Sequence, residues 1–182
     1  MISGATFSDC KRFRYTLTRE WDATLPKVAF IGLNPSTADE TIDDPTIRRC
    51  IGFARTWGYG GLLMLNLFAF RATKPADMWK AWRRGVDIIG GAENWVAALQ
   101  SYAKEQNCDR IIAAWGTHGL GRGGEVSKSW LALECLGLNV DGSPKHPLYL
   151  KGDLVPVSYT ARTSSVLPSA RIAPEIPSIL DV

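Results

Sequence analysis

Four polar side chains that can bind or activate a small molecule stand just beyond apolar runs of this sequence: Asn34, Asn66, His118 and His146. An asparagine amide donates and accepts hydrogen bonds, and a histidine ring can donate, accept or carry a proton near neutral pH. Side chains of these types can hold a water molecule or the edge of a base. Asn34, which precedes Pro35, can also simply satisfy the backbone groups of its own turn.

The apolar runs that end near Asn34, Asn66 and His118 have the composition of buried strands. They cover 27–33, 62–67 and 110–115, and turn-forming residues such as Gly, Asn and Pro stand at or near their ends. Ligands of open α/β sheets bind outside the carboxyl ends of the strands. We therefore expect the four polar residues to lie along one edge of a sheet.

Helical patterns alternate with these strands. Asp44 followed by Pro45 is typical of an N-cap and a first helical residue, and the helical pattern continues to Trp57. The remaining elements are helices over 76–88, 92–106 and 125–136, a fourth strand over 138–140, and a turn at Asp141-Gly142. This order predicts an α/β fold, a three-layer α/β/α sandwich with a central, mostly parallel sheet.

The N-terminal region predicts an antiparallel strand at the edge of this sheet. Its two faces carry Phe13, Tyr15 and Leu17 on one side, and Arg12, Arg14, Thr16 and Thr18 on the other. Arg19 falls on the apolar face and indicates that the strand ends near there. The outward arginines can contact phosphates or protect an exposed edge, and we favour the second interpretation.

Composition indicates one globular domain. The chain has 182 residues, of which 46% are hydrophobic and 21% charged, and its net charge of +3 does not by itself indicate nucleic-acid binding. No apolar run approaches the roughly 20 residues of a membrane span, and no secretory signal is visible. We expect a cytoplasmic monomer with a single domain over 1–159 and a loosely ordered, Ser- and Pro-rich tail over 160–182.

The sequence contains no convincing metal or cofactor motif. The four cysteines, Cys10, Cys50, Cys108 and Cys135, are too scattered for paired zinc ligands, and we expect free thiols. The acidic loop of Asp39, Glu40, Asp43 and Asp44 can be a solvated start of a helix or can hold a divalent cation, and we favour the first interpretation. His118 and His146 alone are too few for a transition-metal site.

Four short motifs, in this order, resemble those of the uracil-DNA glycosylase superfamily. They are Gly32-Leu33-Asn34-Pro35, Leu62–Asn66 followed by Phe68-Ala69-Phe70-Arg71, Ile111–His118, and Lys145-His146-Pro147. The likeness is greatest to the mismatch-specific branch, in which Asn replaces a catalytic Asp. It covers about residues 25–150, and Leu148 stands where the superfamily has a serine.

The whole chain also resembles a bacterial and phage family known only as a domain of unknown function. That family shares the Gly-Leu-Asn-Pro-Ser and His-Pro-Leu-Tyr-Leu motifs. This second resemblance implies no activity.

The superfamily resemblance implies hydrolysis of the N-glycosidic bond of a modified or mismatched pyrimidine in DNA. It implies that Asn34 positions the attacking water and that His146 donates a hydrogen bond to the departing base. Asn66 would hydrogen-bond the Watson–Crick edge of a flipped base, and Phe68 or Phe70 would stack on it. The phosphate contacts implied are Ser36, Arg48, Arg49, Arg71 and Lys145.

Two other functions stay open at this point. The acidic loop and small net charge favour a hydrolase of free nucleosides or nucleotides, and the same fold can serve a non-catalytic binder of nucleic acid or nucleotide. Phe68 and Phe70 can equally fill the core. Because an amide cannot act as a general base, we expect slow or leaving-group-dependent catalysis from Asn34.

Overall fold

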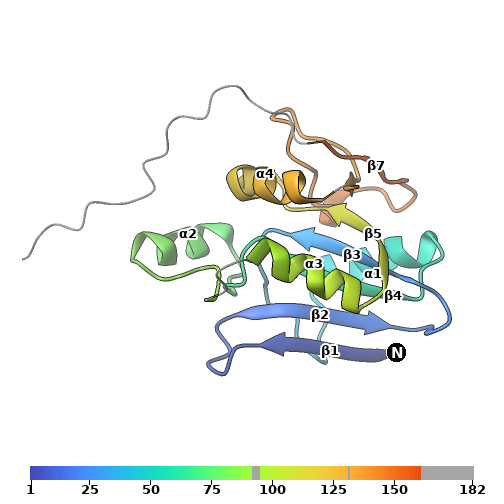
Figure 1. Cartoon of the computed structure of the whole chain (residues 1–182), viewed down its shortest axis with the longest axis horizontal. Helices are drawn as coiled ribbons and strands as arrows, with labels where there is room; N and C mark the ends of the chain where they lie inside the picture. The colour runs from blue at the N-terminus through green and yellow to red at the C-terminus, as the bar shows by residue number, and fades with distance from the viewer. Residues whose placement is uncertain (92–94, 131, 161–182) are drawn as a thin grey trace, which may run out of the picture.

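The computed structural model describes residues 1–91, 95–130 and 132–160 and shows a mixed α/β fold (Figure 1). The strands are β1 (Ile2–Phe7), β2 (Arg14–Glu20), β3 (Lys27–Gly32), β4 (Gly61–Asn66), β5 (Cys108–Ala113), β6 (Glu134–Cys135) and β7 (Val157–Ser158). The helices are α1 (Pro45–Thr56), α2 (Pro75–Arg83), α3 (Trp95–Glu105) and α4 (Leu120–Ser129), with 3₁₀ turns η1 (Thr117–Gly119) and η2 (Pro147–Tyr149).

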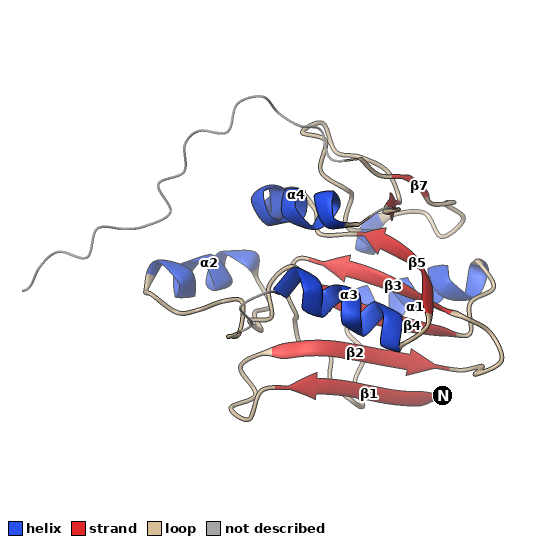
Figure 2. Cartoon of the chain, viewed as in Figure 1, coloured by secondary structure: helices blue, strands red, loops and turns tan. Residues whose placement is uncertain are grey.

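The strands form one sheet in the order β1-β2-β4-β3-β5-β6-β7 (Figure 2). The four strands β4, β3, β5 and β6 run parallel, and the flanking strands are antiparallel to their neighbours. In the β3–β4 register Gly32 lies opposite Asn66, and Ile31 lies opposite Ala113 of β5. The carboxyl ends of these three strands therefore meet at one edge of the sheet.

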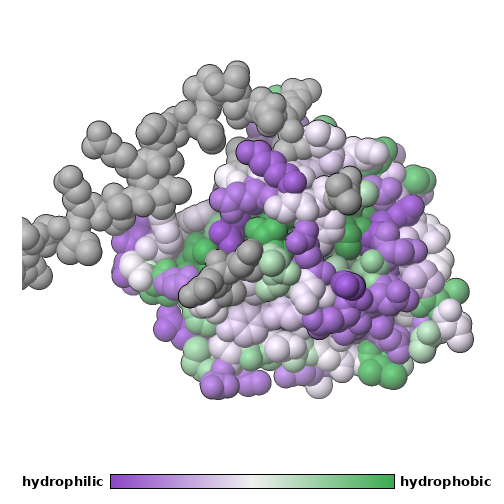
Figure 3. Space-filling view, viewed as in Figure 1, coloured by the Kyte–Doolittle hydropathy of each residue, from purple (hydrophilic) through white to green (hydrophobic). Residues whose placement is uncertain are grey.

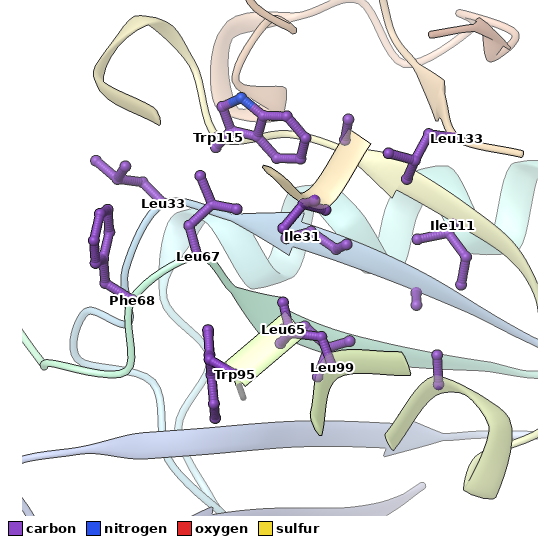
Figure 4. Close-up of a cluster of buried hydrophobic side chains, with 14 of the residues drawn as sticks. Ile31, Leu33, Leu65, Leu67, Phe68, Trp95, Leu99, Ile111, Trp115 and Leu133 are labelled. Carbon is purple, nitrogen blue, oxygen red and sulfur yellow. The ribbon is translucent and has the colours of Figure 1, made fainter. Parts of the chain in front are cut away.

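Both faces of the central strands are buried, which explains why they are continuous apolar runs. Ala29 and Ile31 of β3 belong to a cluster that includes Trp95 and Leu99 of α3 (Figure 4). The alternate residues Val28 and Phe30 pack instead with side chains of α1. The strand pattern predicted from the sequence is thus confirmed for β3, β4 and β5.

Helix α1 begins where the sequence predicts. Asp44 is its N-cap, with a side-chain oxygen accepting from the Ile47 backbone nitrogen at 2.9 Å, and Pro45 is the first helical residue. The helix ends at Thr56, followed by Gly58 with φ of 81°, a conformation that favours glycine. This placement directs the N-terminal end of α1 toward the residues that follow β3.

Strand β2 differs from the predicted edge strand. Strand β1 pairs with its outer side, so β2 is an interior strand, and a register shift opposite Thr6 and Phe7 turns Arg14 to the same face as Leu17. Arg14 and Arg19 are consequently buried. The strand ends at Glu20, next to Arg19, as the sequence predicts, and Arg19 pairs with Asp43 at 2.8 Å. The interpretation of Arg14 as an outward, edge-protecting charge was wrong.

The C-terminal elements also differ from the prediction. Helix α4 covers 120–129 rather than 125–136, and the fourth parallel strand is β6 rather than 138–140. The start of α4 is glycine-rich where it approaches Trp115: a Cβ at Gly123 would lie 2.5 Å from the indole Nε1, so the contact leaves no room for a side chain there. Leu138 instead bridges Pro144 around the predicted Asp141-Gly142 turn. The predicted tail lies almost entirely outside the described residues.

Among the described residues, no helix combines the length and apolar character that crossing a bilayer requires. The face shown in Figure 3 carries interspersed hydrophilic and hydrophobic residues.

Candidate functional site

A cleft of about 730 Å³ opens at the carboxyl ends of the parallel strands. Asn34, Asn66, His118 and His146 all line it, so the structure brings together the four polar residues that follow the apolar runs. Asn34 follows β3, Asn66 ends β4, and His118 lies in η1 just after β5. His146 comes from the segment before η2, which approaches the sheet edge from the C-terminal region.

The walls of the cleft are largely apolar, with a few charged groups. Among the described residues, the charged side chains that line it are Arg14, Asp44 and Lys145. The apolar lining includes Leu33, Ile47, Met64, Trp115, Leu148 and Leu150. A cavity of this size, with a mostly apolar surface on which polar side chains converge, is typical of a site for a small organic molecule or a side group of a larger one.

Asn66 is the most unusual polar group in the cleft. Its side chain is 1% exposed, and neither its amide nitrogen nor its amide oxygen has a hydrogen-bond partner among the described residues. Gly32 provides the space for this amide, because a Cβ there would lie 2.9 Å from Asn66 Oδ1. A buried amide without partners costs about 1–3 kcal/mol per unsatisfied group, so a ligand that pairs with both atoms would be favoured.

Asn34 joins the loops that follow β3 and β4. Its Nδ2 atom donates to the Ala72 carbonyl oxygen at 2.7 Å and to the Pro35 carbonyl oxygen at 3.0 Å. Both amide hydrogens are therefore used within the protein. The Asn34 carbonyl oxygen is the group left to accept a hydrogen bond from water, and it cannot take up a proton as a base would.

His146 lies at the entrance of the cleft as a neutral hydrogen-bond donor. Its Nδ1 atom accepts from the Leu148 backbone nitrogen at 3.3 Å, which places the proton of the neutral ring on Nε2. Desolvation lowers the pKa of His146 below its usual value, although the negative charge of Asp44 opposes this shift. The ring is therefore neutral at pH 7, with Nε2–H free to donate.

Arg14 and Asp44 are cleft residues that the sequence analysis did not assign to the site. Arg14 is 2% exposed, and Asp44 is 8% exposed. Arg14 was missed because nothing in the sequence marks the register shift in β2. Asp44 was predicted only as an N-cap, a role that it does have, and the sequence does not indicate that this cap also lines the cleft.

Both phenylalanines predicted to stack on a base lie outside the cleft lining, so the structure does not bring them together with Asn34, Asn66 and His146. Phe68 is 7% exposed and belongs to the buried cluster of Figure 4. It packs edge-on against Trp79, with ring centroids 5.2 Å apart. Phe70 packs against Phe13 at 5.9 Å. They fill the core, which was the alternative interpretation.

Three of the five predicted phosphate contacts also lie outside the cleft lining. The Arg48 side chain donates to the Asp43 carbonyl oxygen, Arg49 lies over the Phe53 ring, and Arg71 donates to the Lys11 carbonyl oxygen at 3.1 Å. Ser36 and Lys145 do line the cleft. The phosphate contacts of the three arginines stay a prediction, at positions outside the cleft lining where the side chains also interact with nearby protein groups.

The acidic loop is organised by its own hydrogen bonds. An Asp39 side-chain oxygen accepts from the backbone nitrogens of Thr41 and Ile42, both at 2.8 Å, and Asp43 pairs with Arg19. Within the described ranges, no group of three or more His, Cys, Asp or Glu residues is arranged to hold a metal ion. The carboxylates of this loop therefore fix the loop and the start of α1.

A family model described as "Protein of unknown function (DUF1643)" matches residues 14–148. The chain belongs to this family. The DUF1643 match begins at Arg14 and ends at Leu148, so it contains every cleft residue except Tyr149 and Leu150. The expected membership of a family of unknown function is thus confirmed. No curated protein matches the sequence, and no solved structure matches it.

Proposed function

We propose that this member of the DUF1643 family is a glycosylase-like hydrolase that cleaves the N-glycosidic bond of a modified or mismatched pyrimidine in DNA. In this proposal the fold is a three-layer α/β/α sandwich of the uracil-DNA glycosylase type. The observation that carries the proposal is the buried amide of Asn66 in the cleft, which has no hydrogen-bond partner among the described residues.

The Asn66 amide has the hydrogen-bonding pattern that complements a base edge. Its Nδ2 and Oδ1 atoms present a donor beside an acceptor, and pyrimidine Watson–Crick edges present an acceptor beside a donor. Because Asn66 is 1% exposed, a base must enter the cleft fully to reach it. In DNA that requires the nucleotide to be flipped out of the duplex.

The groups at the cleft entrance support cleavage once the base is bound. The Asn34 carbonyl oxygen accepts a hydrogen bond from a water molecule and holds it toward the sugar. The C–N bond breaks with its electron pair moving to the base, while the water oxygen bonds to the sugar carbon and releases its proton to solvent. His146 Nε2–H stabilises the negative charge that develops on the base oxygen.

The charge distribution supports a nucleic-acid substrate. Lys145 and Ser36 lie in the cleft, and α2, whose first residue Pro75 lines the cleft, carries exposed cations. These cations are Lys74 at its N-cap, Lys80, Arg83 and Arg84. Such side chains would neutralise backbone phosphates on either side of a flipped nucleotide.

A second candidate is a hydrolase of free nucleosides or nucleotides. It is favoured by the fact that only Ser36 and Lys145, of the five predicted phosphate contacts, line the cleft. The base-binding and bond-breaking roles of Asn66, Asn34 and His146 would be the same.

Base release distinguishes these functions. The purified protein is incubated with oligonucleotides containing uracil, mismatched thymine or hypermodified pyrimidines, and separately with free nucleosides and nucleotides, and liberated bases are measured by mass spectrometry. The proposal predicts release from DNA that is lost in Asn34→Ala and His146→Asn and kept in Arg12→Met, an exposed control outside the cleft lining. Release from monomers alone supports the second candidate, and release that survives both cleft substitutions contradicts the proposed mechanism.

A further inference from the structure

Arg14 is a buried cation without an ion-pair partner. Its side chain is 2% exposed and lines the cleft. In the described part of the chain it forms no ion pair, and its side-chain hydrogen bond is from Nη1 to the Ala38 carbonyl oxygen at 2.7 Å. Its Nε atom has no hydrogen-bond partner among those residues.

This arrangement is energetically unfavourable without a counter-charge. A guanidinium carries five donors, and burial of a charge without a partner has a large desolvation cost. Desolvation lowers the pKa of Arg14 to about 10, and the negative charge of Asp44 offsets only part of this effect. An anion in the cleft would supply the missing partner, with the paired hydrogen bonds that a planar guanidinium favours.

The position of Arg14 relative to Asn66 indicates where that anion is bound. Strands β2 and β4 are antiparallel neighbours with Leu17 opposite Met64, and the Arg14 backbone nitrogen donates to the Ala69 carbonyl oxygen just beyond β4. Because of the register shift in β2, the Arg14 side chain lies on the same face of the sheet as Leu17. Asn66 follows Met64 by two residues in β4, so these two side chains also share a face. Arg14 and Asn66 therefore lie on one face, at the same end of adjacent strands.

Both side chains lie at the bottom of the cleft, whereas His146 and Lys145 are exposed at its entrance. Under the proposed function, the sugar and its phosphates lie at the entrance, beside His146. The part of the substrate that reaches the bottom of the cleft is the base ring. Of the three charged residues in the described lining, Arg14 and Lys145 are cationic and Asp44 is anionic, so the net charge of that lining is positive.

We propose that Arg14 binds an acidic group carried on the base ring, beside the edge that Asn66 hydrogen-bonds. The substrate class is then a pyrimidine with an anionic ring substituent, of which a carboxylate is the simplest. This inference rests on the proposed function, because it takes the cleft to be a base-binding site.

Free bases test the inference without any requirement for catalysis. Isothermal titration calorimetry compares uracil, uracil-5-carboxylate and uracil-6-carboxylate binding to the full chain. A charge-assisted hydrogen bond to Arg14 predicts that at least one carboxylated base binds about 10- to 100-fold more tightly than uracil. Arg14→Met removes this difference and keeps uracil binding, and the exposed Arg12→Met control retains it.

Circular dichroism shows whether the Arg14→Met variant folds. If it does not fold, a second variant is used. Arg14→Lys keeps the charge but loses the planar pair of donors, and it predicts an intermediate preference for the carboxylated bases. An Asn66→Leu variant weakens the binding of every base.

Each remaining outcome has a distinct meaning. Equal binding of uracil and both carboxylates, or a carboxylate preference that survives Arg14→Met, overturns the role of Arg14 and leaves the base-binding cleft intact. If Arg14→Met instead removes a preference for thymidine 5′-monophosphate over thymidine, Arg14 binds the sugar phosphate and the ring assignment is overturned. Failure of every base to bind the wild-type chain contradicts the proposed function itself.

Discussion

Gly32 and Asn66 lie opposite each other on the paired strands β3 and β4, and a Cβ on Gly32 would lie 2.9 Å from Asn66 Oδ1. The absence of a side chain at Gly32 leaves room for the Asn66 amide in the cleft. The Gly-Leu-Asn-Pro motif therefore does two things: it carries Asn34, and it provides space for the asparagine of the neighbouring strand.

Substitution of Gly32 by Ala tests this relationship. The added methyl group displaces the Asn66 amide and the Met64 methyl group, whose Cε would lie 2.6 Å from the new Cβ. We expect a loss of about 1–2 kcal/mol in the free energy of unfolding, measured by urea denaturation, and weaker uracil binding. Gly52→Ala in α1 is the matched control, because nothing lies within 4 Å of its Cβ position. Normal uracil binding by Gly32→Ala would refute the spatial role of Gly32.

Two isosteric substitutions separate the roles of the His146 ring nitrogens. Asn keeps an acceptor near the Nδ1 position and loses the Nε2 donor, whereas Gln places a donor near Nε2. Kinetics of base release should therefore show a large loss in kcat for His146→Asn and partial retention for His146→Gln. A larger loss in kcat for His146→Gln than for His146→Asn would show that base release depends on the hydrogen bond from the Leu148 backbone nitrogen to Nδ1 rather than on donation by Nε2.

The lowered pKa of His146 predicts a pH dependence of stability. Between its lowered folded-state value and the ordinary value of 6.5, the unfolded chain binds more protons than the folded chain. Stability therefore falls as the pH decreases below about 6.5, and no contribution from this group is expected above it. Urea denaturation at about pH 7.5 and about pH 5.5 measures the loss, which His146→Asn should reduce. Asp39 and Asp141, whose pKa values are lowered from 3.8, contribute only at more acidic pH.

Arg19 stabilises the loop that carries Ser36, Thr37 and Asp44 to the cleft. It pairs with Asp43 at 2.8 Å and donates to the Asp39 carbonyl oxygen at 2.6 Å. Arg19→Met should lower the free energy of unfolding by about 2–4 kcal/mol, because Asp43 and this carbonyl group lose their partner. In thermal denaturation the control Arg83→Met, at an exposed position of α2, should change stability by less than about 0.5 kcal/mol. Equal effects would show that Arg19 does not fix the loop.

These examples show which parts of the site follow from local sequence. Asn34, Asn66 and His118 stand at or shortly after the carboxyl ends of continuous apolar strands, so their convergence at one sheet edge could be predicted from the strand pattern. Asp44 could be assigned as a helix cap because Asp followed by Pro has a local meaning.

The residues that were misplaced depend on contacts between distant parts of the chain. Arg14 faces the cleft because of a register shift against β1, which no composition rule indicates. The glycines at the start of α4 have poor helix propensity, and the close approach of Gly123 to Trp115, which requires glycine there, is not visible in the local sequence. Phe68 could belong to a binding loop or to the core by its type, and the neighbouring Trp79 places it in the core.

The central claim is that the Asn66 amide binds a base, and nuclear magnetic resonance tests it most directly. Uracil is titrated into ¹⁵N-labelled protein, the Asn66 side-chain amide is assigned by its loss in Asn66→Leu, and the exposed Asn107 amide serves as a reference. The account predicts a saturable shift of the Asn66 Nδ2–H₂ resonances that the Asn107 resonances do not share. Unchanged Asn66 resonances at uracil concentrations that saturate binding elsewhere would contradict the account.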